Sequence, residues 1–250
     1  MDRPISTVLV VDDNAINLRL AEIMLNQHGA KVVTASSGGV AVQLAEKHTF
    51  DIIFMDLHMP GLDGCATTEH IRQLDTDTKP IIIALTANAM PAERTHVYES
   101  GMNDIMIKPI NEQLMNAVIS KWLGQTPADK KNITQDKTDS TVFSLEKAST
   151  FTEGNAALAL ELIHMLKLEL PEYQIKIASA LESKNYTELK SQVHKLHGAS
   201  RCCGTPALCS AAAHMEQLID NKSQHDVLAT AANKLSHEIS RLLEISINDH

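Results

Sequence analysis

Acidic, hydroxyl and lysine side chains stand where short β-type runs end in the first half of this sequence. The five residues are Asp12, Asp13, Asp56, Thr86 and Lys108. A single aspartate after a strand is commonly a turn residue or a helix cap, but several carboxylates at one edge repel unless a cation joins them. Oxygen-only ligands suit Mg²⁺, and a carboxylate beside Mg²⁺, an ammonium and a hydroxyl can attack phosphorus. The joint pattern therefore favours a site where an aspartate forms an acyl phosphate.

A second chemical pattern lies in the stretch SQVHKLHGASRCCG, residues 191–204. With helical spacing, one face is apolar and the other carries Lys190, His194, His197 and Arg201. We therefore expect both histidines to be exposed and surrounded by positive charge. A zinc pair fits poorly, because HxxH lacks the HExxH spacing and the two cations would repel a metal ion. The alternatives are a solvated helix face and a phosphoryl acceptor, since neutral imidazole is a competent nucleophile toward phosphorus.

Five short runs rich in valine and isoleucine occur in residues 1–124, with helical spacing between them. They are VLVV (8–11), KVVTA (31–35), DIIFM (51–55), PIIIAL (80–85) and DIMI (104–107). Such runs, buried on both faces, indicate a parallel sheet covered by helices on two sides. Residues 1–124 therefore predict a doubly wound α/β domain with a five-stranded parallel sheet, where function gathers at the carboxyl ends of the strands.

The character of the sequence changes after this domain. Residues 125–142, QTPADKKNITQDKTDSTV, are polar and lack an apolar period, so we expect a flexible linker. Residues 143–250 contain amphipathic helical patterns, which predict an all-α bundle of four antiparallel helices with a short leading helix. Pro171 interrupts the first long pattern and should kink or divide that helix.

Composition argues against several classes of function. A net charge of −9 and an aromatic content of 3% disfavour binding to a nucleic-acid backbone or to stacked bases. The four cysteines lack paired CxxC spacing, so we expect reduced thiols in a cytoplasmic protein. The sequence holds no apolar segment near the roughly 18 residues that a membrane span needs.

The strand-end residues, with MDLHMPGLDG around Asp56, closely resemble the receiver domain of two-component response regulators over residues 6–123. The resemblance implies that Asp56 is the phosphoacceptor and that Thr86 and Lys108 contact the phosphoryl group. The implied magnesium ligands are Asp12, Asp13, Asp56 and the backbone carbonyl of His58. Many receivers carry an aromatic switch residue three positions before the lysine, where this chain has Ile105, so we do not expect the usual aromatic switch.

The second pattern, V-H-x-L-x-G-(A/S)-S ending in Gly204, looks like a histidine phosphotransfer (HPt) domain. The resemblance implies that His194 is phosphorylated and that His197 is a helper, at a position where many members have lysine. A histidine helper should be less reliably charged and more sensitive to pH. A receiver followed by an HPt domain resembles the C-terminal end of hybrid sensor kinases of the BarA/GacS type. This order implies a phosphorelay between an upstream sensor histidine kinase and the receiver domain of a downstream response regulator.

Other classes of function stay open at this point. Only a few residues precede the first strand candidate, so we expect no ATP-binding kinase core in this chain, which either stands alone or is the tail of a longer one. An aspartate-nucleophile phosphohydrolase would want a DxDx(T/V) motif, whereas LHMP follows Asp56. A scaffold with silent sites is a further alternative. A transcription factor fits least, because the second domain has no basic recognition helix.

Overall fold

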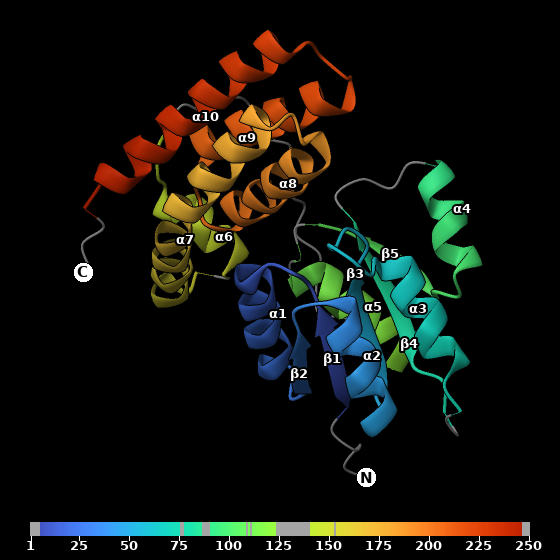
Figure 1. Ribbon diagram of the computed structural model, residues 1–250. Helices are drawn as coiled ribbons and strands as arrows, with labels where there is room; N and C mark the ends of the chain where they lie inside the picture. The colour runs from blue at the N-terminus through green and yellow to red at the C-terminus, as the bar shows by residue number, and fades with distance from the viewer. Residues whose placement is uncertain are drawn as a thin grey trace. The chain divides into compact units, whose positions relative to one another are not determined.

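The computed structural model describes residues 6–75, 78–86, 91–108, 110, 112–123, 141–152 and 154–246. The chain divides into two compact units, residues 1–131 and 132–250 (Figure 1). The dividing point falls within the linker predicted for residues 125–142. Most of that linker lies outside the described residues, so its flexibility stays a prediction.

A five-stranded parallel sheet forms the centre of the first unit, with the strand order β2-β1-β3-β4-β5. The strands are β1 (Thr7–Val11), β2 (Lys31–Ala35), β3 (Ile52–Asp56), β4 (Ile81–Thr86) and β5 (Asp104–Ile107). All five predicted strands are confirmed, and so is the doubly wound α/β class. Burial on both faces holds for β1, β3 and β4, but β2 and β5 are partly exposed because they lie at the edges of the sheet.

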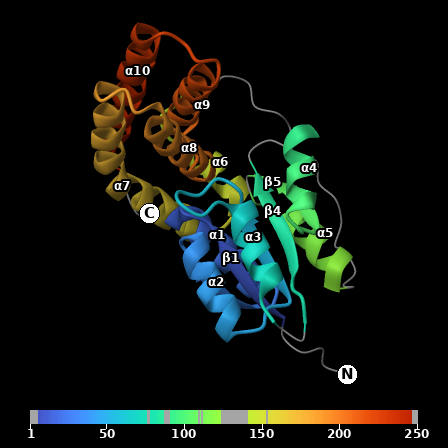
Figure 2. The same ribbon diagram turned by 45° about the vertical axis from the view of Figure 1, so that its right-hand side comes forward.

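Helices connect the strands and cover both faces of the sheet. They are α1 (Ala15–Gln27), α2 (Gly38–Lys47), α3 (Gly64–Gln73), α4 (Pro91–Glu99) and α5 (Glu112–Leu123). Helices α2 and α3 lie side by side on one face, and α5 lies on the opposite face (Figures 1 and 2). The layers bury nearly all of the central strands, and the polar side chains of the predicted site lie where those strands end.

Strand order and register bring two of these ends together. Strand β1 pairs with β3, and Val11 stands beside Met55 in that register. The next residues along each strand, Asp12 and Asp56, therefore meet at the same edge of the sheet. At the next pairing, Asp56 stands beside Leu85, which places Thr86 at the same end. The backbone register of the sheet therefore brings these residues of the predicted site to one edge.

The second unit is a helical bundle, as predicted. Its helices are α6 (Leu145–Phe151), α7 (Ala156–Glu182), α8 (Tyr186–Cys202), α9 (Pro206–Asp220) and α10 (His225–Glu244). Helix α8 packs against α7 and α9, α10 closes the ring by packing against α9 and α7, and the short α6 packs on α7. Among the described residues, the helices do not combine the length and apolar character that crossing a membrane requires.

Pro171 lies inside helix α7 and does not divide it, so that part of the expectation is wrong, while a kink at Pro171 stays a prediction. Proline removes one backbone donor and usually interrupts a helix. Here Pro171 is exposed, whereas Leu166, Leu170 and Tyr173 on either side of it are buried in the bundle. Packing of that apolar face holds the helix together across the missing hydrogen bond.

Gly204 links the end of α8 to the start of α6. Its φ of +63° lies in the left-handed region, and its carbonyl accepts a hydrogen bond of 2.8 Å from the amide of Ser144. A Cβ atom at this position would come within 2.7 Å of the backbone nitrogen of Ala148 and still closer to the carbonyl oxygen of Ser144. The position therefore requires glycine for its conformation and for its lack of a side chain.

We expect Gly204→Ala to lower the free energy of unfolding of the second unit by about 2–4 kcal/mol, because left-handed strain and overpacking add. The matched control is Gly154→Ala, at a φ of +79° with open space around the new Cβ. The control should lose only about 1–2 kcal/mol, from strain alone. Urea unfolding of both full-length variants tests this, and equal losses would contradict the close approach at Gly204.

Candidate functional site

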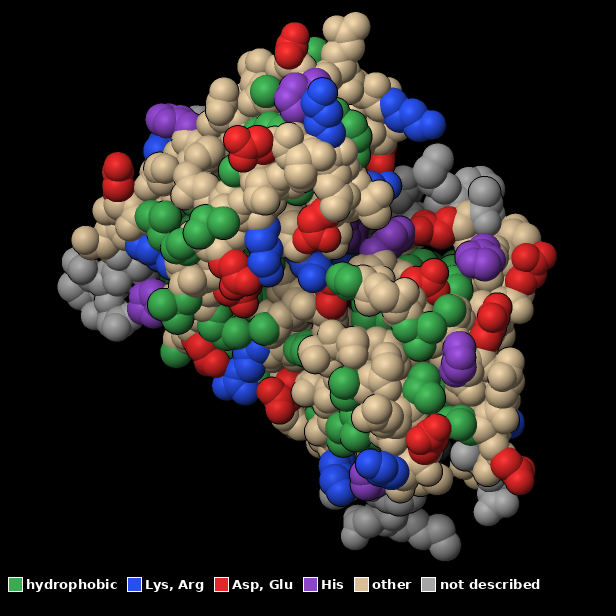
Figure 3. Space-filling view, viewed as in Figure 1, with side chains coloured by type: hydrophobic (Ala, Val, Ile, Leu, Met, Phe, Trp, Pro, Cys, Tyr) green, Lys and Arg blue, Asp and Glu red, His purple; other side chains and the backbone are tan. Residues whose placement is uncertain are grey.

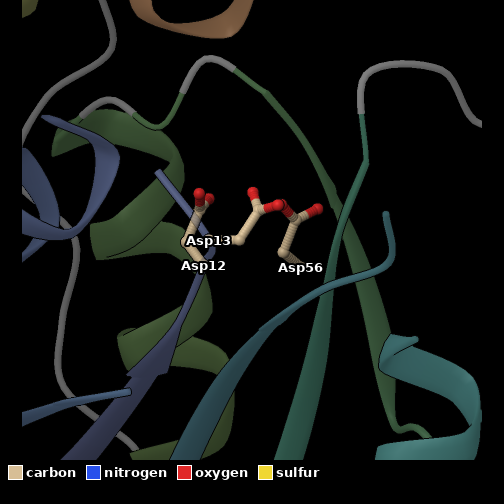
Figure 4. A group of neighbouring side chains, drawn as sticks. All are labelled: Asp12, Asp13 and Asp56. Carbon is tan, nitrogen blue, oxygen red and sulfur yellow. The ribbon is translucent and has the colours of Figure 1, made fainter. Parts of the chain in front are cut away.

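Three carboxylates meet at the carboxyl ends of β1 and β3. Asp12 and Asp13 directly follow β1, and Asp56 is the last residue of β3. One oxygen from each lies within 4.8 Å of the others, and Figure 4 shows the three side chains together. Asp12 and Asp56 are buried, while Asp13 is half-buried. Buried carboxylates at this spacing need positive charge to offset their repulsion.

Lys108 supplies part of that charge. Its Nζ lies 2.8 Å from Oδ2 of Asp12 and 2.7 Å from Oδ2 of Asp56. The lysine directly follows β5, and its amide donates to the carbonyl of Thr86 at 2.7 Å, which ties the fourth and fifth strand ends together. Three carboxylates and one ammonium leave a formal charge of −2. The atoms that could ligate a metal ion are the carboxylate oxygens. This charge and donor set fit a divalent cation of the Mg²⁺ type.

The backbone around the cluster fixes the two buried carboxylates. Asp12 accepts a hydrogen bond of 2.9 Å from the amide of Asn14 and two from the side-chain amide of Asn17, at 3.1 and 3.2 Å. Asn14 also caps α1, so the start of the helix and the position of Asp12 depend on each other. Asp56 accepts from the amide of His58 at 3.2 Å, and a Cβ on Gly64 would collide with the Asp56 carbonyl.

Burial sets the ionisation of the cluster. It raises the pKa of Asp56 to about 6, although Lys108 pulls in the opposite direction; the charge of Asp12 adds to the rise. Burial alone would lower the pKa of Lys108, but the carboxylates of Asp12 and Asp56 outweigh it and hold that pKa above its usual range. Lys108 therefore stays charged, and the aspartates share its single positive charge.

Thr86 ends β4 as predicted, but its hydroxyl is engaged with helix α4. It donates to Oε2 of Glu93 at 3.2 Å, and Nε2 of His58 lies 3.6 Å from Oε1 of the same carboxylate. Sequence reasoning missed Glu93, whose signal was its place in the first turn of the helix after Thr86. The role of the His58 carbonyl as a metal ligand stays a prediction. Ile105 is half-buried and packs against the apolar core.

The two histidines of α8 share one carboxylate on α9. Nδ1 of His194 lies 2.6 Å from Oε1 of Glu216, and Nδ1 of His197 lies 2.7 Å from Oε2. The side chains of both histidines are 18% exposed and that of Glu216 is 16% exposed. The expectation of exposed histidines is wrong, because α9 packs a carboxylate against them, and this carboxylate adds negative charge where the sequence predicted positive surroundings.

The cations expected around the histidines are partly neutralised. Nζ of Lys190 lies 2.6 Å from Oδ1 of Asp220, in a pair that is about half exposed. Acidic and basic side chains are interspersed over the described surface in view in Figure 3. Exposed pairs of this kind contribute little to stability, whereas the half-buried Glu216 interacts in a less screened environment.

Glu216 determines the charge of the pair. Burial alone would raise its pKa, but the hydrogen bonds from His194 and His197 lower that pKa well below the usual range. An ionised carboxylate only accepts hydrogen bonds, so Nδ1 of each histidine carries a hydrogen. Nε2 of His194 is then the ring nitrogen with the lone pair whenever that ring is neutral, and it is the nitrogen that can attack phosphorus.

The surroundings of His197 shift its pKa. Burial alone would lower its pKa, but hydrogen bonds with Cys209 and Glu216 raise it to about 9. The stabilisation from this pairing is complete below the ordinary pKa of about 6.5 and is lost as the pH rises through about 9. This shift favours the charged form of His197 at neutral pH. A pKa of about 9 still lies below that of an ordinary lysine, so the expectation of a helper less reliably charged and more sensitive to pH stays a prediction.

Sequence reasoning also missed Glu216. Its signal was weak but present: it lies one turn after Ala212 and next to Met215, both buried, at the margin of the apolar face of α9. An acid at the edge of a buried stripe needs a partner. The sequence could not name the partner, because the rotation of α9 against α8 decides which residues meet.

The two units now define a class of protein. Residues 8–120 match the family of response regulator receiver domains, and residues 161–245 match the Hpt domain family. The chain thus carries a receiver domain followed by an Hpt domain, the two modules of a two-component phosphorelay.

Similar proteins link these modules to sensor kinases. The chain is 36% identical to the sensor histidine kinase GacS of Pseudomonas protegens and 29% identical to the histidine-protein kinase BarA of Escherichia coli K12. Each match covers 94% of this chain and 26% of the relative, so the chain spans about a quarter of their length. The receiver domain of a sensor histidine kinase from Pseudomonas aeruginosa, solved with magnesium in its active site cleft, is 36% identical over 48% of this chain and 99% of its own, with a TM-score of 0.45.

We expect Lys108→Met to lower the free energy of unfolding of the first unit by about 3–5 kcal/mol in EDTA, because two buried carboxylates lose their counter-charge. Millimolar Mg²⁺ should stabilise this variant more than the wild type, since the metal then supplies the missing charge. The control is Lys121→Met, which breaks an exposed pair with Asp104 and should cost at most about 1 kcal/mol. Thermal unfolding with and without Mg²⁺ measures both, and an equal Mg²⁺ effect in all three proteins contradicts the site.

Proposed function

We propose that this chain is a phosphorelay intermediate in which Asp56 accepts a phosphoryl group from a kinase histidine and His194 passes it to a downstream receiver. The observation that carries the proposal is the buried cluster of Asp12, Asp13, Asp56 and Lys108 in a chain that also holds an imidazole with Nδ1 fixed. The receiver and Hpt families supply the order of the two sites.

Acceptance at Asp56 follows from the charges around it. Asp12, Asp13 and Asp56, with the carbonyl of His58, would hold Mg²⁺, which when bound would neutralise charge on the phosphoryl oxygens. An Oδ atom of Asp56 attacks phosphorus, the bond from phosphorus to the donor nitrogen breaks, and an acyl phosphate forms. Lys108 moves from bridging two carboxylates to pairing with the phosphoryl group, and the Thr86 hydroxyl leaves Glu93 to donate to a phosphoryl oxygen.

Transfer to His194 reverses the chemistry at a second nucleophile. Nε2 of His194 attacks phosphorus with its lone pair, the Oδ–phosphorus bond breaks, and Asp56 leaves as a carboxylate. The proton on Nδ1 stays in place, so the ring becomes cationic and no separate base is needed. The phosphorylated imidazole can then deliver the group to another aspartate by the same steps in reverse.

The similar proteins support a choice of partners. GacS and BarA are histidine kinases, which supports a kinase histidine as the upstream donor. The proposed downstream acceptor is the aspartate of a separate response regulator, since a phosphoimidazole can transfer its phosphoryl group to a carboxylate. We propose that the chain acts as the relay part of such a system, in the cytoplasm, and receives its phosphoryl group from a histidine kinase.

Radiolabelled acetyl phosphate with Mg²⁺ tests the order of the sites on the full chain. The wild type should carry base-labile label on Asp56 and acid-labile label on His194, because acyl phosphates and phosphoimidazoles differ in stability. Asp56→Asn should lose both labels, and His194→Gln should keep the first alone. EDTA should abolish both.

The control variant is His214→Gln, an exposed histidine on α9, which should label like the wild type. Acid-labile label that persists in His194→Gln, or label that reaches a downstream receiver from this variant, would sink the assignment of His194. Base-labile label that persists in Asp56→Asn contradicts the assignment of Asp56.

A further inference from the structure

The carboxylate of Glu93 joins two groups beside the acidic cluster of the receiver domain. The Thr86 hydroxyl donates to its Oε2 at 3.2 Å, and Nε2 of His58 lies 3.6 Å from its Oε1. The backbone amide of His58 in turn donates to Asp56 at 3.2 Å. A chain of contacts therefore runs from the predicted phosphoacceptor through His58 and Glu93 to Thr86, and it ties the ends of β3 and β4 to the first turn of α4.

We infer that Glu93 is an autoinhibitory residue of the receiver domain, because it holds the hydroxyl that an incoming phosphoryl group needs. The inference rests on the proposed roles of Asp56 as the phosphoacceptor and of Thr86 as a donor to the phosphoryl group. It predicts that removing the charge of Glu93 speeds phosphorylation, whereas removing a residue that assists the reaction would slow it.

The first argument is the single hydrogen of the Thr86 hydroxyl. A hydroxyl carries one hydrogen, so it can donate one strong hydrogen bond at a time. Thr86 is 1% exposed, so a hydroxyl that leaves Glu93 gains little from water and needs its new acceptor within the site. Donation to Glu93 and donation to a phosphoryl oxygen therefore exclude each other, and a phosphoryl group that Thr86 stabilises must first displace the carboxylate.

The second argument is the charge that Glu93 adds. Three carboxylates and Lys108 already give a formal charge of −2, and Glu93 places a further negative group next to Thr86. A phosphoryl group is anionic, so Glu93 repels it as it reaches Asp56. The Glu93 side chain is 28% exposed, so solvent screens this repulsion only in part. His58 offsets little of it, since its side chain is 47% exposed and its distance to Glu93 is long.

Helix stabilisation alone does not account for the position of Glu93. It is the acidic residue in the first turn of α4, where a negative charge interacts favourably with the helix dipole. A side chain directed into solvent would serve that purpose equally well. Glu93 instead contacts a buried hydroxyl at the end of another element, which ties it to the chemistry of the site.

Initial rates of labelling by radiolabelled acetyl phosphate with Mg²⁺ test the inference on the full chain. The parent and all variants carry His194→Gln, so that label stays on Asp56. We expect Glu93→Gln to raise the rate about 3- to 10-fold, because the amide still accepts from Thr86 but a neutral hydrogen bond is weaker than a charge-assisted one. The matched control is Glu99→Gln, which removes an exposed negative charge about 9 Å further along α4 and should label at the parent rate.

A Thr86→Val background shows whether Glu93 acts through the hydroxyl. Valine keeps the approximate shape of threonine and removes the hydrogen for which Glu93 and the phosphoryl group compete. There the gain from Glu93→Gln should fall below about twofold, because only the repulsion remains. A gain as large as in the parent overturns the inference, and so does an unchanged or slower rate for Glu93→Gln with Thr86 present. An equal gain in Glu99→Gln also overturns it, because the effect would then follow from net charge.

Beryllium fluoride, which mimics a phosphoryl group on a carboxylate, gives an equilibrium readout. Calorimetric titration in Mg²⁺ should show tighter binding to Glu93→Gln than to the parent by a factor similar to the gain in rate, with Glu99→Gln unchanged and no binding to Asp56→Asn. A parent that takes no label and binds no beryllium fluoride contradicts the proposed function itself. A parent that does both, with a Glu93→Gln variant that matches it, contradicts only the role of Glu93.

Discussion

The bridge from Lys108 to two buried carboxylates is the interaction on which the first domain depends. Asp12 and Asp56 are almost completely buried. Among the described residues, Lys108 is the cation that pairs with both of them. The lysine can neutralise only one of three negative charges, so the cluster keeps a net negative charge that favours binding of a divalent cation. Stability and chemistry are coupled here. The negative charge of the carboxylates that would bind a cation is also the charge that Lys108 must offset in the folded protein.

In the second domain the balance of charge is reversed, because one negative group contacts two side chains that can carry positive charge. Two imidazoles one turn apart on α8 face one carboxylate on α9. Glu216 contacts each ring through a different oxygen, and Cys209 hydrogen-bonds with His197. Both of these partners lie on α9, so the packing of α9 against α8 sets the surroundings of the two rings.

How much the sequence could reveal depended on where each contact originates. Asp12, Asp56, Thr86 and Lys108 were predictable because parallel strands bring their carboxyl ends to one edge regardless of side-chain detail. Glu216 and Glu93 were not, since each meets its partner through the rotation of one helix against another element. The predicted division of the helix at Pro171 is wrong for a related reason. Local propensity favours a break there, but the buried residues around Pro171 pack into the bundle and the helix continues.

The pairing of β1 with β3 has a consequence for how the receiver site arises during folding. Side chains alternate between the two faces of a strand, so a slip of one residue in this register would move Asp56 away from Asp12 and turn the strand's apolar residues over. Such a slip would lower the stability of the fold by disrupting packing in the core, whether or not phosphate is present. A mispaired sheet is thus rejected by its own hydrophobic interior, and assembly of the acidic pocket needs no selection beyond correct folding.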